Sequence, residues 1–376
     1  MGPSYRIVFY ISGHGFGHTS RAIEVIDAVL RSQPEARVAV KTSAPRHLFE
    51  HTLHDRCEVV PLECDAGIVQ MDSLNLDAPA SVRRAVEFQK RLPQLVATEA
   101  SYLRESAARV AVGDIPPLAA AAAHAAGIPS VLIGNFTWDW IYEGYRDPAA
   151  PGLARDIRRL YHDATVALRL PMAGGFAGLE PITRDIPFIA LRSNRTQDEV
   201  RSALGLPPRE KDKPLALMAF GGHGIAGLDA PALAAQKDYR IATTDVPAAG
   251  ATNKPASGLL YISRQQMNDT GLRFVDLVKG ADVVVTKPGY GIISEAIAND
   301  AAMLYTSRGQ FVEYDVLVRE MPRYLRAQFI AQDDLLKGNW IEALRHVLNQ
   351  PPPPDTPALN GADVAAETIL RLIGST

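Results

Sequence analysis

The sequence Ser12-Gly13-His14-Gly15-Phe16-Gly17-His18 follows an apolar run at residues 6–11 and precedes an amphipathic pattern that begins at Arg21. This order predicts a strand, a glycine-rich turn and a helix. Glycine at alternate positions lets the backbone turn tightly and approach a ligand, and the helix that follows directs its N–H groups toward the same place. The turn is therefore a predicted binding site, and His14 and His18 are its candidate chemical groups.

Two familiar sites do not fit this turn. A dinucleotide site has the spacing G-x-G-x-x-G and an acidic residue after the second strand, whereas here the spacing is G-x-G-x-G and the second strand ends in Lys41. A zinc site would need the Glu of an H-E-x-x-H helix or a further cluster of His or Cys ligands, so no metal is expected. A structural role, in which the two histidines only cap the turn, stays open.

The bulk composition limits the function classes. A chain of 376 residues predicts two domains. A net charge of −3 without a basic stripe argues against nucleic-acid binding. Cys57 and Cys64 are not spaced as C-x-x-C and no leader precedes the first strand, so the cytoplasm is expected. The alanine-rich residues 118–126 are too short to span a bilayer and predict a buried helix, while peripheral membrane contact stays open.

Apolar, β-branched runs alternate with helical patterns along the chain, which predicts two doubly wound Rossmann-like units in series. The strands are expected at residues 7–11, 37–41, 59–62, 110–112, 130–133 and 165–170, and then at 215–220, 240–243, 258–262, 283–286 and 302–305. Residues 192–214 are polar and contain a Pro-Pro break, so they predict a connection. The expected domains are residues 1–195 and 196–355, with a helix in 356–376 that crosses back to the first domain.

Ligands of open α/β sheets bind beyond the carboxyl ends of the strands, so the loops there are the candidate sites. Asp114 follows a strand of the first domain and is placed to orient an imidazole, or, as the alternative, to cap the next helix. In the second domain, residues 286–295 predict a glycine turn and a helix start, where Lys287 and backbone N–H groups could hold a diphosphate and Glu295 could accept from ribose hydroxyls. Residues 220–224 form another glycine turn.

With these features the chain resembles the GT-B glycosyltransferases, whose two Rossmann-like domains face each other across a cleft. In members that form lipid II or glucosylate small plant molecules, the first glycine turn carries a His at the place of His18. The plant enzymes pair that His with an Asp, which Asp114 matches. The donor motif of the family is similar to residues 289–295.

A closer resemblance, over nearly the whole chain, is to the N-terminal glycosyltransferase-like half of plant L-arabinose kinases and its stand-alone bacterial relatives. It rests on residues 13–18, 72–81, 135–142, 220–222 and 289–296. The chain lacks a serine-rich phosphate loop, so kinase activity is not implied. His223-Gly224 follows the Gly-Gly turn where the lipid II enzyme has Ser-Gln, which leaves the identity of the nucleotide and of the sugar open.

The resemblance implies an enzyme that moves a sugar from a nucleotide-diphosphate sugar, with UDP favoured, to a hydroxyl of a small-molecule, glycan or lipid acceptor. The transfer is expected to be inverting, and to need no metal because the sequence has no Asp-x-Asp pair that would hold a cation on the diphosphate. No cofactor is expected besides the nucleotide sugar as co-substrate. His18 is the expected base, Asp114 its partner and His14 the competing base. A nucleotide-sugar 2-epimerase of the same fold and a non-catalytic sugar-binding module are the alternatives.

The remaining candidate residues belong to two sets. The expected donor-binding residues are Gly17, Phe220, Gly221, Gly222, Lys287, Pro288, Gly289, Tyr290, Gly291, Ser294, Glu295 and Glu313. The expected acceptor-binding residues are Gln70, Asp72, Asn135, Trp138, Asp139 and Tyr142. For Trp138 and Tyr142, packing in the core is the alternative interpretation.

Overall fold

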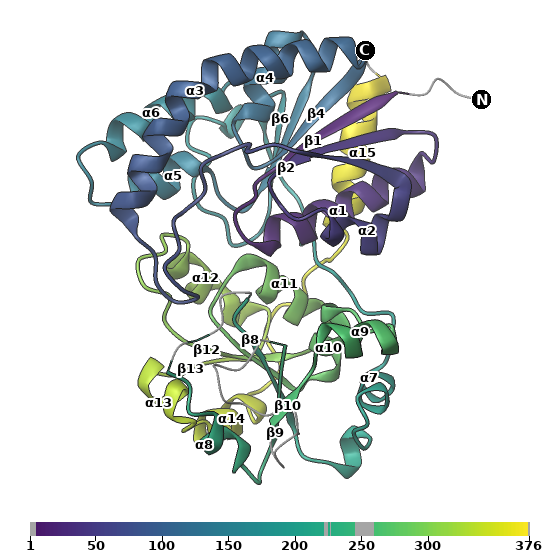
Figure 1. The fold of residues 1–376 in the computed structure, drawn as a ribbon, viewed down its shortest axis with the longest axis vertical. Coiled ribbons are helices and arrows are strands. Elements are labelled where there is room, and N and C mark those ends of the chain that lie inside the picture. Colours follow the sequence, from purple (N-terminus) through teal and green to yellow (C-terminus); the bar gives the residue numbers. More distant parts are fainter. Residues whose placement is uncertain (1–4, 222–224, 226, 245–258, 375–376) are drawn as a thin grey trace. The chain divides into compact units, whose positions relative to one another are not determined.

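The computed structural model describes residues 5–221, 225, 227–244 and 259–374, and the chain forms two compact units (Figure 1). Unit 1 takes its described residues from 5–69, 77–190 and 357–374, and unit 2 takes them from 70–76 and 191–356. Each unit has one parallel β-sheet with helices packed on it. The predicted α/β chain with two Rossmann-like units is confirmed.

The sheet of unit 1 has seven strands in the order β3-β2-β1-β4-β5-β6-β7. The strands are β1 (Arg6–Ile11), β2 (Arg37–Thr42), β3 (Cys57–Pro61), β4 (Ala108–Asp114), β5 (Ser130–Gly134), β6 (Val166–Arg169) and β7 (Thr183–Asp185). Five of the six residues of β1 are buried, as expected for a central strand of a parallel sheet that is covered on both faces. The short edge strand β7 was not predicted from the sequence.

Helices cover both faces of this sheet (Figure 1). They are α1 (Phe16–Ser32), α2 (His47–Leu53), α3 (Ala78–Glu105), α4 (Leu118–Ala126), α5 (Trp138–Glu143), α6 (Ala150–Tyr161) and α15 (Gly361–Gly374), with short 3₁₀ turns at His54–Arg56 and Glu180–Ile182. The first six residues of α4 are buried, which confirms the buried alanine-rich helix. Its small side chains allow close contact with β4, since a Cβ at Gly113 would lie 2.7 Å from Cβ of Ala119.

The last helix of the chain, α15, packs beside α1 in unit 1 (Figure 1). The segment that leads into it is fixed by two backbone hydrogen bonds, from Phe188 N–H to the carbonyl of Ala358 and from Gly361 N–H to the carbonyl of Phe188. Asp363 also pairs with Arg31 of α1 at 3.1 Å. The end of the described chain therefore returns to unit 1.

The sheet of unit 2 has six strands in the order β10-β9-β8-β11-β12-β13. They are β8 (Leu215–Ala219), β9 (Arg240–Thr243), β10 (Leu259–Tyr261), β11 (Val283–Thr286), β12 (Ala302–Tyr305) and β13 (Ala327–Phe329). The helices are α7 (Gln197–Ala203), α8 (Ala230–Ala234), α9 (Arg264–Thr270), α10 (Phe274–Gly280), α11 (Tyr290–Ala298), α12 (Tyr314–Glu320), α13 (Gln332–Lys337) and α14 (Ile341–Leu348), with 3₁₀ turns at Arg209–Lys211 and Met321–Arg323. Only β13 was not predicted among these strands.

Residues 70–76 come between two pieces of unit 1 in sequence but pack in unit 2. Ser73 Oγ donates a hydrogen bond to the carbonyl of Phe220 at 2.9 Å, and the buried Leu74 belongs to the same hydrophobic core as Phe220. Gly309 has φ +51°, and a Cβ there would lie 3.0 Å from the carbonyl oxygen of Leu74. The segment therefore lies against the loops that follow β8 and β12.

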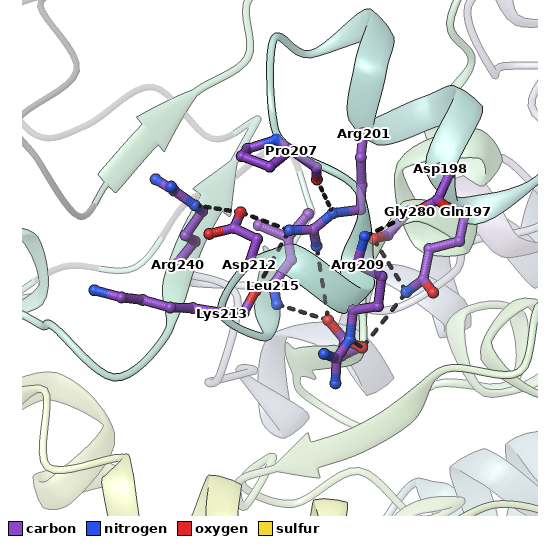
Figure 2. Close-up of polar contacts among 11 residues, drawn as sticks. Gln197, Asp198, Arg201, Pro207, Arg209, Asp212, Lys213, Leu215, Arg240 and Gly280 are labelled. Carbon is purple, nitrogen blue, oxygen red and sulfur yellow. Dashed lines mark hydrogen bonds and ion pairs between the residues drawn. The ribbon is translucent and has the colours of Figure 1, made fainter.

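A buried arginine, Arg201, lies near the amino ends of strands β8, β9 and β11 in unit 2 (Figure 2). Arg201 of α7 is fully buried and donates to the carbonyl of Pro207 at 2.9 Å and to Asp212 Oδ2 at 2.7 Å. Its Nη1 lies 3.8 Å from Asp282 Oδ2. Arg201 therefore joins the polar residues 192–214, expected to be a connection, to the body of unit 2.

Two further arginines pair with the same carboxylates (Figure 2). Arg240 Nε donates to Asp212 Oδ2 at 2.6 Å, and Arg209 pairs with Asp282. Asp282 Oδ2 also accepts the backbone N–H of Leu215 at 2.8 Å, where β8 begins. Because buried charges are tolerated only when paired and hydrogen-bonded, this network fixes the starts of β8, β9 and β11.

Candidate functional site

The glycine turn of unit 1 lies at the point where the strand order changes direction, between β1 and β4. Such switch points are where open α/β sheets bind ligands. The N-cap of α1 is Gly15 with φ +74°, a conformation that other residues rarely adopt. A Cβ at Gly13 would lie 1.9 Å from Ser43 Oγ, so a larger residue there would displace that hydroxyl. His18 falls in the first turn of α1 and Asp114 is the last residue of β4.

The structure brings His18 and Asp114 together. His18 Nδ1 lies 2.8 Å from Asp114 Oδ1, and both side chains are buried. Arg21, one turn further along α1, holds the same carboxylate through two donors, Nε to Oδ2 at 2.8 Å and Nη2 to Oδ1 at 2.6 Å. The result is a three-residue site of imidazole, carboxylate and guanidinium.

Burial alone would raise the pKa of Asp114, but the charge and hydrogen bonds of Arg21, with the hydrogen bond of His18, hold that pKa below its usual value. Asp114 is therefore an anion near pH 7, and it can accept the Nδ1 proton of a neutral His18. In that tautomer Nε2 carries a lone pair and can accept a proton.

Arg21 was not singled out in the sequence. It lies three residues after His18, a spacing that puts two side chains on the same face of a helix. A charged residue on the apolar face of this helix is the sequence feature that could have indicated it. Its third donor, Nη1, reaches Oδ1 of Asn135 at 3.1 Å in the loop after β5. The predicted acceptor residue Asn135 is thus buried against the site, where it fixes the guanidinium.

A second buried carboxylate, Asp65, was also missed. Asp65 accepts hydrogen bonds from Ser12 Oγ at 3.0 Å and from Trp138 Nε1 at 2.9 Å, and Ser12 Oγ in turn accepts the N–H of His14 at 3.2 Å. Asp65 therefore links the glycine turn to α5. It lies in the loop after β3, beyond the carboxyl end of a strand where ligands of such sheets bind, but no neighbouring motif indicates it.

Burial raises the pKa of Asp65 to about 6, although the hydrogen bonds from Ser12 and Trp138 act in the opposite direction. The unfolded chain releases this proton near pH 4, whereas the folded protein keeps it until about pH 6. Between pH 4 and 6 the unfolded state therefore binds fewer protons than the folded state. The stabilisation that protonated Asp65 gives the fold below pH 4 is lost as the pH rises to 6.

We therefore expect Asp65→Asn, which is neutral at every pH, to unfold at a higher urea concentration than the wild type near pH 7. The gain in the free energy of unfolding should grow between pH 4 and 6 and level off at roughly 2–3 kcal/mol. Urea titrations at several pH values measure it. Asp156→Asn, at an exposed position of α6, is the matched control and should follow the wild-type curve; a gain for Asp65→Asn that does not vary with pH would contradict the assignment.

The aromatic acceptor candidates are core residues in this structure. Trp138 is 1% exposed and stacks on Tyr142 with ring centroids 5.8 Å apart, and Tyr142 donates from its hydroxyl to the carbonyl of Gly67 at 2.7 Å. Asp139 is buried and pairs with Arg158 at 2.8 Å. Trp138 also packs edge-on against His14, with ring centroids 5.8 Å apart. These side chains support the glycine turn, and an acceptor-binding role for them stays a prediction.

Of the other acceptor candidates, Gln70 and Asp72 lie on the segment that packs in unit 2. Asp72 Oδ1 accepts the backbone N–H groups of Leu74 and Asn75 at 2.7 and 2.8 Å, which fixes the turn. Burial acts to raise the pKa of Asp72, but these bonds, the Asn75 side chain and the charge of Lys287 lower it. Asp72 is therefore within electrostatic range of the predicted donor site.

The switch point of unit 2 lies between β8 and β11, where Phe220-Gly221 and Lys287-Pro288-Gly289 follow the two strands. Gly289 is the N-cap of α11 and has no side chain with which to cap the helix. Helix N-termini of this kind bind phosphate groups. Glu295 is buried in α11.

The placement of the remaining donor candidates differs from residue to residue. Tyr290 is buried, Ser294 Oγ donates to the carbonyl of Gly291 at 2.9 Å, and Glu313 is the N-cap residue of α12. Gly17 belongs to α1 in unit 1. Gly222 lies outside the described residues.

Arg308, in the loop after β12, was missed by the sequence analysis. Its Nη1 donates to the carbonyl of Pro288 and to Glu313 Oε1, both at 3.2 Å, and its guanidinium stacks on Phe311 at 3.5 Å. Arg308 therefore adds a second cationic side chain beside the turn that carries Lys287. Among the described residues, no group of three or more His, Cys, Asp or Glu side chains is placed to hold a metal ion.

The fold is similar to that of solved glycosyltransferases. The glycosyltransferase of kitacinnamycin superposes with a TM-score of 0.61 at 16% identity and covers 99% of this chain and 95% of its own. The calicheamicin glycosyltransferase CalG4 gives 0.58 at 14% identity, with 99% and 94% covered. The chain has the GT-B fold. MurG of Acinetobacter baumannii shares this GT-B fold with a TM-score of 0.53 at 14% identity, over 98% of this chain and 99% of that one.

The sequence of this chain is 26% identical over 378 residues to that of L-arabinokinase of Arabidopsis thaliana. The match covers 96% of this chain but 34% of that protein, so the chain spans about a third of the length of its curated relative. No family model matches the sequence. Within the part of the chain that the structure describes, no helix has both the length and the apolar character needed to cross a membrane.

Proposed function

We propose that this protein is an inverting, metal-independent glycosyltransferase that moves a sugar from a nucleotide-diphosphate sugar, with UDP favoured, to a hydroxyl of a small-molecule, glycan or lipid acceptor. The observation that carries the proposal is the buried contact of His18 with Asp114 at the switch point of unit 1. His18 Nε2 takes the proton of the acceptor hydroxyl while its oxygen bonds to the anomeric carbon. The bond from that carbon to the phosphate oxygen breaks, and its electron pair leaves with the nucleoside diphosphate.

Unit 2 has groups that would hold a diphosphate without a metal ion. Lys287 and Arg308 both lie in loops beyond the carboxyl ends of the strands, next to the start of α11. A helix N-terminus and two cations stabilise the negative charge that develops on the leaving group. Glu295 would accept from ribose hydroxyls, as the family resemblance implies.

One observation favours a second candidate, a sugar-binding module without catalysis. The chain matches about a third of a relative whose name is that of a kinase, so the matched region is one part of a larger enzyme. A binding role would use the same polar groups as hydrogen-bond partners. Only turnover separates the two candidates.

The first test is a binding panel of UDP, GDP, TDP and ADP and of their sugar conjugates, by thermal shift and calorimetry in the presence of a chelator. A ligand at one hundred times its Kd stabilises the folded protein by about 2.7 kcal/mol. We expect one diphosphate to give a clear stabilisation and Lys287→Ala to lose it. Lys279→Ala is the matched control, because Lys279 lies in α10 of the same unit and pairs with Asp300.

The outcomes separate the candidates. Binding followed by acceptor-dependent release of the nucleoside diphosphate supports transfer, and conversion of the donor alone supports a 2-epimerase. Binding without turnover for any acceptor supports the binding module. If none of these nucleotides or sugar conjugates binds, the assignment of the donor site is overturned.

A further inference from the structure

The site of unit 1 holds a negative charge away from water, and the protein has to balance it. Asp114 is 2% exposed, His18 is 7% exposed and Arg21 is 5% exposed. Two residues are therefore able to supply the positive charge, the guanidinium of Arg21 or a doubly protonated His18. Which of them does so decides whether His18 can accept a proton.

The contacts of Asp114 favour Arg21. Its Nε and Nη2 reach both oxygens of Asp114 at 2.8 and 2.6 Å, the side-on geometry in which a guanidinium binds a carboxylate most strongly. An arginine keeps its proton in proteins, so this pair is neutral as a whole. With the pair neutral, Asp114 no longer requires a positive charge on His18.

The same contacts decide which ring nitrogen of His18 carries the proton. Nδ1 lies 2.8 Å from Asp114 Oδ1 and 3.2 Å from Arg21 Nη2. The carboxylate can only accept, and Nη2 already donates to it at 2.6 Å. The shorter contact is therefore an Nδ1–H donated by His18, and Nε2 keeps its lone pair.

Other charged groups face His18 from the elements around it. Asp65, in the loop after β3, acts on the ring electrostatically, and His14 lies in the glycine turn. Phe136 and Trp138 cover the ring, with centroids 5.5 and 6.5 Å away. Both carboxylates favour a positive charge on His18, so a cation that opposes them is required to keep the ring neutral.

We propose that Arg21 is a positioning residue that keeps His18 uncharged, with its proton on Nδ1, by neutralising Asp114. Asn135 holds the guanidinium in place from the loop after β5. The importance of Arg21 for catalysis rests on the proposed function, whereas its effect on the protonation state of His18 is independent of that function.

The test is nitrogen-15 NMR of the histidine rings near pH 7, with His18→Gln identifying the His18 signal among the nine histidines. In the wild type we expect a neutral ring protonated on Nδ1. In Arg21→Met both ring nitrogens should be protonated, because His18 then neutralises Asp114. Arg21→Lys keeps a cation and should keep a neutral ring, and Arg21→Met with Asp114→Asn removes both charges and should restore it.

A doubly protonated His18 in the wild type, or a neutral His18 in Arg21→Met, would overturn the proposal. If Arg21→Met does not fold, Arg21→Gln provides a polar amide donor without the charge and is expected to show the doubly protonated ring. The wild-type spectrum alone is also decisive, since it needs no variant.

A kinetic readout separates this role from simple structural support. If transfer is found, Arg21→Met should lose at least about tenfold in kcat near pH 7 and recover it as the pH rises, because a base is regained when the ring releases its extra proton. An equal loss at every pH would indicate misfolding. If no transfer is found but the spectra are as expected, the proposed function fails and this inference stands.

Discussion

Replacing His18 with Ala should lower the rate of sugar transfer by roughly 10²- to 10⁴-fold, the contribution of a general base. The described contacts of the imidazole with Asp114, Arg21, Phe136 and Trp138 all lie within unit 1, whereas the predicted donor residues other than Gly17 belong to unit 2. We therefore expect donor affinity to change by less than about twofold. Transfer rates at saturating donor and calorimetry of the same variant measure the two effects.

His14→Ala is the matched control, because His14 is the other imidazole of the glycine turn. His14 Nδ1 accepts the backbone N–H of Ile68 at 3.3 Å, so the ring proton lies on Nε2, where it can only be donated. This tautomer is unsuited to a base. We expect His14→Ala to lose less than about tenfold; a larger loss than that of His18→Ala would give the role of base to His14.

Replacing Arg201 with Met should lower the free energy of unfolding of unit 2 by about 3–5 kcal/mol, the cost of removing one partner from a buried ion cluster. Arg201 is fully buried between Asp212 and the carboxylate of Asp282. Without it, the charge of two nearly buried carboxylates is balanced by the partly exposed Arg209 and Arg240, and the carbonyl of Pro207 loses its donor.

Hydrogen exchange of the β8 and β11 amides is the suitable measurement, because it reports on unit 2 even if the chain unfolds in more than one step. Arg209→Met is the matched control. The side chain of Arg209 is 37% exposed and pairs with Asp282, so we expect this variant to lose at most about 1 kcal/mol in the free energy of unfolding. Unchanged protection of β8 in Arg201→Met would contradict the structural role of the network.

The repeated order of strands and helices, and the glycine turns at the carboxyl ends of β1 and β11, could be predicted because each is a local pattern. Asp114 was found for the same reason, since it directly follows a strand. Arg21 and Arg308 could not be found in this way, because their role depends on contacts with residues far away in sequence. Asp65 has no motif around it.

The polar residues 192–214 show that a polar composition does not by itself indicate exposure to solvent. A run such as Arg209-Glu210-Lys211-Asp212-Lys213 is typical of a solvated connection. In the fold, Arg201 and Asp212 from this stretch meet Asp282, more than sixty residues later, and become part of the interior of unit 2. Charge pairing across such a distance leaves no trace in a local pattern.

Residues 70–76 limit how the chain can be divided into fragments that keep their hydrophobic cores. A fragment that encodes only residues 191–356 would lack Leu74, and the apolar side chains it covers, Phe220 among them, would face water. Ending the chain at residue 356 would in turn remove α15 and uncover its side of α1. Unit 2 can be isolated only by splicing residues 70–76 back onto it, and unit 1 only by rejoining three separate pieces of sequence.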